Sequence, residues 1–160
     1  MLRDRLVRWW TKWGTVIQAA VFAVGFYALM VGKHNAFHTF ALDLGKFDQA
    51  IWNTLHGRFL FSTLQNRSIL ANHFSPYMAV LSPLFLLWSD VRALFAVHAL
   101  GLAVAGLLLA EIVRREHPGL APWFSLAFYL NPALHEVTLT EVPVSYTHLR
   151  AHETSLHLVC

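Results

Sequence analysis

Long apolar blocks alternate with shorter polar segments along this chain, and the three longest blocks predict membrane-spanning helices. They cover residues 14–32, 93–113 and 120–134. A helix needs about 20 apolar residues to cross roughly 30 Å of hydrocarbon, so the first two blocks have the length of a span. The third block is shorter and contains Pro132. The pattern therefore predicts an all-α, polytopic integral membrane protein with about three spans in residues 1–143.

The segment between the first two spans, residues 33–90, is the most polar part of the chain and is predicted to be a loop with helices of its own. Apolar side chains recur in it at helical spacing, at Phe40, Leu44, Phe47, Ile51 and Leu55. They predict an amphipathic helix over residues 42–55, ended by His56 and Gly57. Residues 76–88 are apolar but too short to span and are interrupted by Pro83, which is typical of re-entrant or interfacial helices.

Small residues in the second span predict close approach of a neighbouring helix. They form two pairs four residues apart, Gly101 with Ala105 and Gly106 with Ala110. Near the end of the same span, Glu111 lies within one turn of Arg114, so we expect an ion pair there rather than an isolated intramembrane acid.

Charge indicates how the spans are oriented. The chain is 56% hydrophobic and 13% charged, where soluble domains carry roughly 25% charged residues. Its net charge of +3 comes from scattered basic residues, which argues against a nucleic-acid partner. Basic residues and tryptophans cluster before the first span, and Arg114 and Arg115 follow the second. Because positive charge stays cytoplasmic, we expect a multi-pass cell-membrane protein in contact with lipid, with its N-terminus inside and residues 33–90 outside.

A cleaved signal peptide is the competing interpretation of the first apolar block. The apolar region of a signal peptide is usually shorter than this block, and no A-x-A cleavage pattern follows it; the chain continues instead with Lys33, His34 and Asn35. These features favour an uncleaved first span.

The last residues of the chain differ in character from the rest. Residues 144–154 read VSYTHLRAHET, which resembles the translation of a sequencing adapter, and residues 157–160 match the next adapter segment. The alternative is a native amphipathic tail rich in histidine. We leave residues 144–160 out of the fold prediction, and Cys160, the single cysteine, is left out with them, so neither a disulfide nor a thiol site is predicted.

Polar residues of the 33–90 segment are the candidates for chemistry. Asp43, Asp48 and His73 could act in proton transfer or hold a divalent cation, although solvated loop residues would look the same. Three arginines are candidate contacts for a phosphate group, since guanidinium binds phosphate in bidentate fashion: Arg58, Arg67 and Arg92. Ordinary interfacial anchoring is the alternative for all three.

Two sequence blocks carry a resemblance to a known family. Residues 37–53 read FHTFALDLGKFDQAIWN, and residues 72–76 read NHFSP. These blocks resemble a prokaryotic membrane family, the domain of unknown function 2079, over about residues 37–134. That family in turn resembles the GT-C membrane glycosyltransferases, which carry an acidic residue in the first extracytoplasmic loop and typically use a polyprenyl-phosphate sugar as donor.

The resemblance implies an enzyme that inverts an anomeric carbon, with Asp43 as the base and Arg or His groups steadying the leaving phosphate. The later acidic-aromatic-His block of the family is not seen, and neither are further spans, so this chain alone is expected to be inactive. Any cofactor is unknown. A non-enzymatic membrane protein, such as a transporter or assembly factor, is the alternative function.

Overall fold

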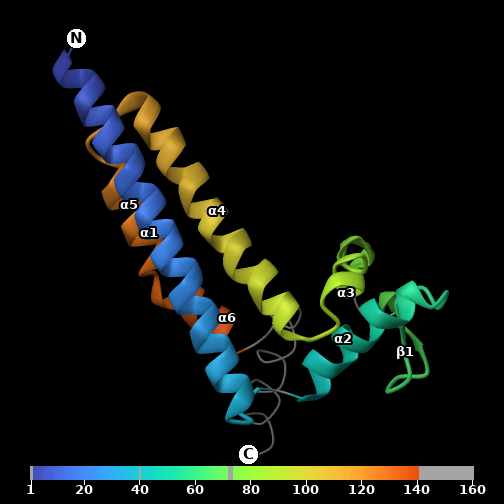
Figure 1. The fold of residues 1–160 in the computed structure, drawn as a ribbon. Coiled ribbons are helices and arrows are strands. Elements are labelled where there is room, and N and C mark those ends of the chain that lie inside the picture. The colour runs from blue at the N-terminus through green and yellow to red at the C-terminus, as the bar shows by residue number, and fades with distance from the viewer. Residues whose placement is uncertain (1, 40, 72–73, 141–160) are drawn as a thin grey trace, which may run out of the picture. The chain divides into compact units, whose positions relative to one another are not determined.

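The computed structural model describes residues 2–39, 41–71 and 74–140, and they form two compact units (Figure 1). We call residues 2–38 with 90–135 the helical unit and residues 39–89 the loop unit. Helices dominate both units, as the sequence predicts, and the described residues contain one small sheet of two strands.

Two long apolar helices form the frame of the helical unit. Helix α1 (Leu2–Asn35) has 34 residues, and α4 (Arg92–Glu116) has 25. By length and composition both are apolar enough to cross a membrane, α1 over Trp9–Asn35, and they contain the first two predicted spans. At 1.5 Å per residue α1 is about 50 Å long and exceeds the hydrocarbon thickness. It begins well before residue 14, because no proline breaks the basic N-terminal segment.

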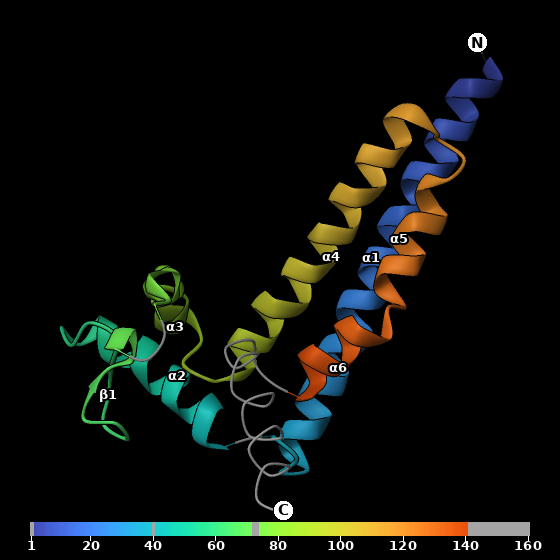
Figure 2. The same cartoon turned by 180° about the vertical axis from the view of Figure 1, so that it is seen from behind.

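Small side chains on one face of α4 allow α5 (Ala121–Tyr129) to pack closely, and α5 also lies along α1 (Figure 2). A Cβ atom built on Gly106 would lie 2.4 Å from Cζ of Tyr129. The Tyr129 hydroxyl donates a hydrogen bond of 2.7 Å to the carbonyl oxygen of Ala103, and its ring stacks on Phe22 at 4.6 Å. The pair Gly106–Ala110 therefore packs as predicted. Gly101 differs: it is exposed, and a Cβ atom added to it would meet no atom of the described residues within 4 Å.

Several polar side chains of the apolar helices form hydrogen bonds with one another. Arg114 donates through Nη2 to Oγ1 of Thr15 at 2.7 Å, and the same hydroxyl donates to the carbonyl oxygen of Lys12 at 2.8 Å. Arg114 also pairs with Glu111, which confirms the predicted ion pair. Closer to the middle of α1, the Ser125 hydroxyl donates to Oε1 of Gln18 at 2.6 Å. Pairing of this kind is expected of polar groups at membrane depth, because lipid offers no hydrogen-bond partner.

The predicted third span is divided rather than continuous. Helix α5 ends at Tyr129, and α6 (Pro132–Thr140) begins three residues later, so residues 120–134 do not form one helix. Pro132 explains the break, since it has no N–H and its ring clashes with the preceding turn. Asn131 accepts the amide of Ala133 through Oδ1 at 3.0 Å, and the ring of His135 hydrogen-bonds the carbonyl oxygen of Tyr129. These side chains satisfy backbone groups that the break leaves unpaired.

The loop unit is built around α2 (Ala41–Leu55), which confirms the helix predicted over residues 42–55. Gly57 follows it with φ of 78°, the left-handed conformation expected just after a helix C-terminus. A hairpin of β1 (Phe61–Ser62) and β2 (Arg67–Ser68) comes next, and then three short helices. They are η1 (Ile69–Ala71), η2 (Pro76–Leu81) and α3 (Leu84–Leu87), with Pro83 between the last two as predicted. The largest fully buried apolar side chains of its core are Phe47, Ile51, Leu60 and Ile69.

Candidate functional site

Helix α2 carries both candidate acids of the loop unit. Asp43 lies in its first turn, and Asp48 follows five residues later. On a regular helix this spacing turns one residue by about 140° from the other, so the two acids do not share a face. Asp48 is half-buried, whereas the side chain of Asp43 lies outside the described part of the structure. His73 lies outside the described residues altogether.

Burial along α2 follows the amphipathic pattern that predicted the helix. Leu44, Phe47 and Ile51 are buried and form the face that packs toward the hairpin and η2. The opposite face presents Trp52 and His56, whose rings stack at 3.7 Å between centroids. Asp48, Trp52 and His56 are spaced by four residues and therefore lie along one side of the helix. This side therefore carries a carboxylate, an indole and an imidazole in one row, with the two rings stacked on each other.

The β1–β2 hairpin is held against α2 by two polar side chains that sequence reasoning missed. Gln49 donates to Oγ1 of Thr63 at 2.6 Å and accepts the amide of the same residue at 2.9 Å. Asn53 donates to the carbonyl oxygen of Phe61 at 2.8 Å. Asn53 is buried, and both residues belong to the D-Q-x-x-W-N block. Within the described structure they therefore act as braces that fix the hairpin to the acid-bearing helix.

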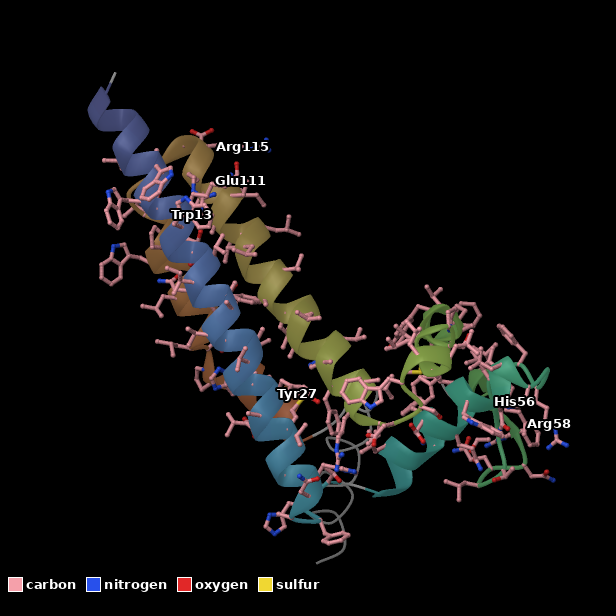
Figure 3. The ribbon with its side chains drawn as sticks, in the orientation of Figure 1. Trp13, Tyr27, His56, Arg58, Glu111 and Arg115 are labelled. Carbon is pink, nitrogen blue, oxygen red and sulfur yellow. The ribbon has the colours of Figure 1, made fainter. Side chains whose placement is uncertain are left out.

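The three candidate arginines fall into two groups. Arg58 and Arg67 belong to the loop unit and are exposed; the guanidinium of Arg58 lies 5.9 Å from the centre of the Phe61 ring. Both side chains are accessible to solvent, and Figure 3 shows Arg58 at the edge of the loop unit. Arg92 belongs to the helical unit. It donates to Oδ1 of Asn35 at 3.0 Å and so joins the start of α4 to the end of α1.

Asp90 completes this junction between α1 and α4. One carboxylate oxygen accepts the backbone amide of Arg92 at 2.8 Å, and the other lies 3.9 Å from its guanidinium. The side chains of Asp90 and Arg92 thus both have structural partners within the helical unit. Arg92 therefore has a structural role at the junction of α1 and α4.

The described part of the chain contains no preformed metal site. Residues 2–39, 41–71 and 74–140 contain no group of three or more His, Cys, Asp or Glu side chains that could hold a metal ion. Binding of a divalent cation therefore stays a prediction from the sequence. The described residues supply no complete set of ligands for it.

Comparison with known families supplies the identification. A family model described as a predicted membrane protein, DUF2079, matches residues 33–142, more than half of the chain. The chain belongs to this family. The DUF2079 match begins near the end of α1 and includes the whole loop unit together with α4 and α5. No curated protein and no solved structure matches the chain.

The family description agrees with the two apolar helices α1 and α4, and it confirms the family predicted from the sequence blocks. The DUF2079 region contains every residue singled out as a candidate for chemistry: Asp43, Asp48, Arg58, Arg67, His73 and Arg92. The chain is thus a membrane protein in whose sequence the polar loop unit follows α1 and precedes α4.

Proposed function

We propose that the full-length protein is a membrane glycosyltransferase of the GT-C type, which uses a polyprenyl-phosphate sugar as donor. The observation that carries this proposal is the position of α2 directly after α1. Residues 36–40 are all that separate the two helices. A fully extended chain covers about 3.3–3.6 Å per residue, so the start of α2 lies within about 20 Å of the end of α1. Asp43 is therefore tethered near the membrane surface, where a lipid-linked sugar presents its anomeric carbon.

Asp43 is proposed as the general base of the transfer. It takes the proton of an acceptor hydroxyl while the hydroxyl oxygen forms a bond to the anomeric carbon. The bond from that carbon to the phosphate oxygen breaks, and the electron pair leaves with the polyprenyl phosphate. Arg58 and Arg67 would stabilise the negative charge on the leaving phosphate. Asp48 and His73 are the further candidates for proton transfer.

The proposed orientation has the N-terminus in the cytoplasm and the loop unit outside the cell membrane. Arg114 contacts Thr15, and Trp13, Glu111 and Arg115 lie at the same end of the helical unit in Figure 3. The basic segment before the first span and the basic end of α4 are thus at one end of the α1–α4 pair. Positive charge concentrated at one end supports the cytoplasmic assignment of that end.

Substitution of Asp43 in a full-length family member tests the catalytic proposal. Asp43→Asn should reduce transfer of labelled sugar from polyprenyl phosphate in membrane vesicles by about 10²–10⁴-fold, the usual contribution of a general base. Asp90→Asn is the matched control: asparagine keeps the Oδ1 that accepts the backbone amide of Arg92, so transfer should stay normal. Normal transfer by the Asp43→Asn variant would remove the catalytic role.

Deletion of the full gene separates this proposal from the alternative of a transporter or assembly factor. A glycosyltransferase predicts that one glycosylated product disappears and that its polyprenyl-phosphate sugar accumulates. An unchanged glycolipid and glycoprotein profile would favour the non-enzymatic function.

A further inference from the structure

Residues 74–88 form an apolar segment at the end of the loop unit, and we call it the apolar foot. It contains η2 and α3 and has no charged residue. Its large apolar side chains are exposed, with 77% of Val80, 74% of Leu86 and 88% of Leu87 accessible. Contiguous exposed apolar surface of this kind is rare on water-soluble units and marks an interaction site.

The apolar foot buries Met78 and Phe85 but leaves several large aliphatic side chains exposed while it buries two serines. Ser75 and Ser82 are buried, and the Ser82 hydroxyl donates to the carbonyl oxygen of Ala79 at 2.6 Å. Leu86 and Leu87 face outward instead. A segment in water would place leucine inside and leave serine outside, because burying leucine is favourable and exposing it is not. A buried serine hydroxyl with a hydrogen-bond partner, together with aliphatic groups outside, is the arrangement expected in contact with lipid.

Chain connectivity keeps the apolar foot near the bilayer. Trp88 is four residues before Arg92, the first residue of α4. At about 3.3–3.6 Å per residue, it lies within about 14 Å of the start of a helix that is apolar and long enough to span. Tyr77 and Trp88 are exposed at the two ends of the foot, and such residues concentrate at membrane interfaces.

We infer that the apolar foot inserts into the outer leaflet and anchors the loop unit to the bilayer through contact with lipid acyl chains. Met78 and Phe85 hold the foot together from inside, and the exposed aliphatic side chains form the lipid-facing surface. Because η2 packs against α2 within the same unit, the anchor also fixes the depth of the acid-bearing helix at the membrane surface. The inference rests on the membrane assignment and does not require glycosyl transfer.

Depth-dependent fluorescence quenching tests this inference on the whole chain. Two single-cysteine variants, Leu87→Cys and Leu64→Cys, are made with Cys160 replaced by serine and are labelled with an environment-sensitive dye. Both leucines are exposed in the loop unit, Leu87 in the foot and Leu64 in the hairpin loop, so neither substitution disturbs a core. Each is reconstituted in phosphatidylcholine–phosphatidylglycerol vesicles with either spin-labelled lipid or iodide on both sides.

At residue 87 the dye should emit at shorter wavelength and be quenched several-fold more by spin-labelled lipid than by iodide, whereas at residue 64 the order should reverse. Equal iodide quenching at both positions would overturn the inference. Absence of quenching of the residue-87 probe by both agents would also overturn the inference, because protein rather than lipid would then cover this position. Circular dichroism of both variants checks that the helices are retained. Because no sugar transfer is measured, failure here is distinguishable from failure of the proposed activity.

Discussion

Replacing Gly106 by alanine places a methyl group where the ring of Tyr129 now lies. The added carbon would be 2.4 Å from Cζ and 2.5 Å from Cε1 and Oη. Ordinary carbon contacts lie at about 3.5–4.0 Å, so one of the two helices must move. The ring cannot simply rotate aside, because its hydroxyl is bonded to Ala103 and its face is stacked on Phe22.

The expected cost combines two terms. Overpacking a tight contact costs about 1–3 kcal/mol. Loss of the Tyr129–Ala103 hydrogen bond adds about 0.6 kcal/mol, the average measured between helices in a membrane protein. Against these stands the higher helix propensity of alanine, worth up to about 1 kcal/mol. We therefore expect Gly106→Ala to lower the unfolding free energy by about 0.6–2.6 kcal/mol.

Gly101→Ala is the matched control on the same helix. The added Cβ atom would have no atom of the described residues within 4 Å, so the unfolding free energy should stay unchanged or rise by up to about 1 kcal/mol. The measurement is SDS-driven unfolding in mixed micelles, followed by circular dichroism. Combining Gly106→Ala with Tyr129→Ala should cost less than the sum of the two single changes, since the clash is gone. Equal stability of the Gly106 and Gly101 variants would refute the close α4–α5 contact.

Two further predictions concern buried polar groups. Thr15→Val leaves Arg114, whose side chain is only 11% exposed, without one acceptor, and should lower the unfolding free energy by about 1–3 kcal/mol in the same SDS titration. Asn53→Ala removes the bond to the Phe61 carbonyl and should speed amide exchange in residues 61–68 by about 5–30-fold, the factor that corresponds to 1–2 kcal/mol. The exposed substitutions Ile17→Val and Leu64→Ala should change neither quantity, and equal effects from them would contradict the assigned roles.

Local sequence patterns were sufficient to predict helix α2. The apolar spacing of Leu44, Phe47 and Ile51, together with the stop at Gly57, predicted α2 to within one residue, because helix periodicity and termination depend on neighbours along the chain. The break between α5 and α6 was only partly visible. Pro132 weakened the third span in the sequence, but the capping of the break by Asn131 depends on conformation that no pattern specifies.

Contacts between distant residues were not accessible from the sequence. The hydrogen bonds of Gln49 and Asn53 were not predictable, since their partners lie 8–14 residues away in a hairpin without strong strand signals. Arg92 and its partner Asn35 are 57 residues apart in the sequence. The sequence alone therefore offered no reason to separate Arg92 from the other candidate phosphate contacts. The acids of α2 could be named as candidates, but a carboxylate within a polar segment does not by itself indicate which face of the unit is functional.

Cysteine accessibility in intact cells tests the central claim that the loop unit lies outside a membrane crossed by α1 and α4. Leu64→Cys in the hairpin loop and His117→Cys after α4 are both at exposed positions, and each is made with Cys160 replaced by serine. A membrane-impermeant maleimide should label residue 64 in intact cells and residue 117 only after permeabilisation. Labelling of residue 117 in intact cells, or protection of residue 64 until the membrane is opened, would contradict the account.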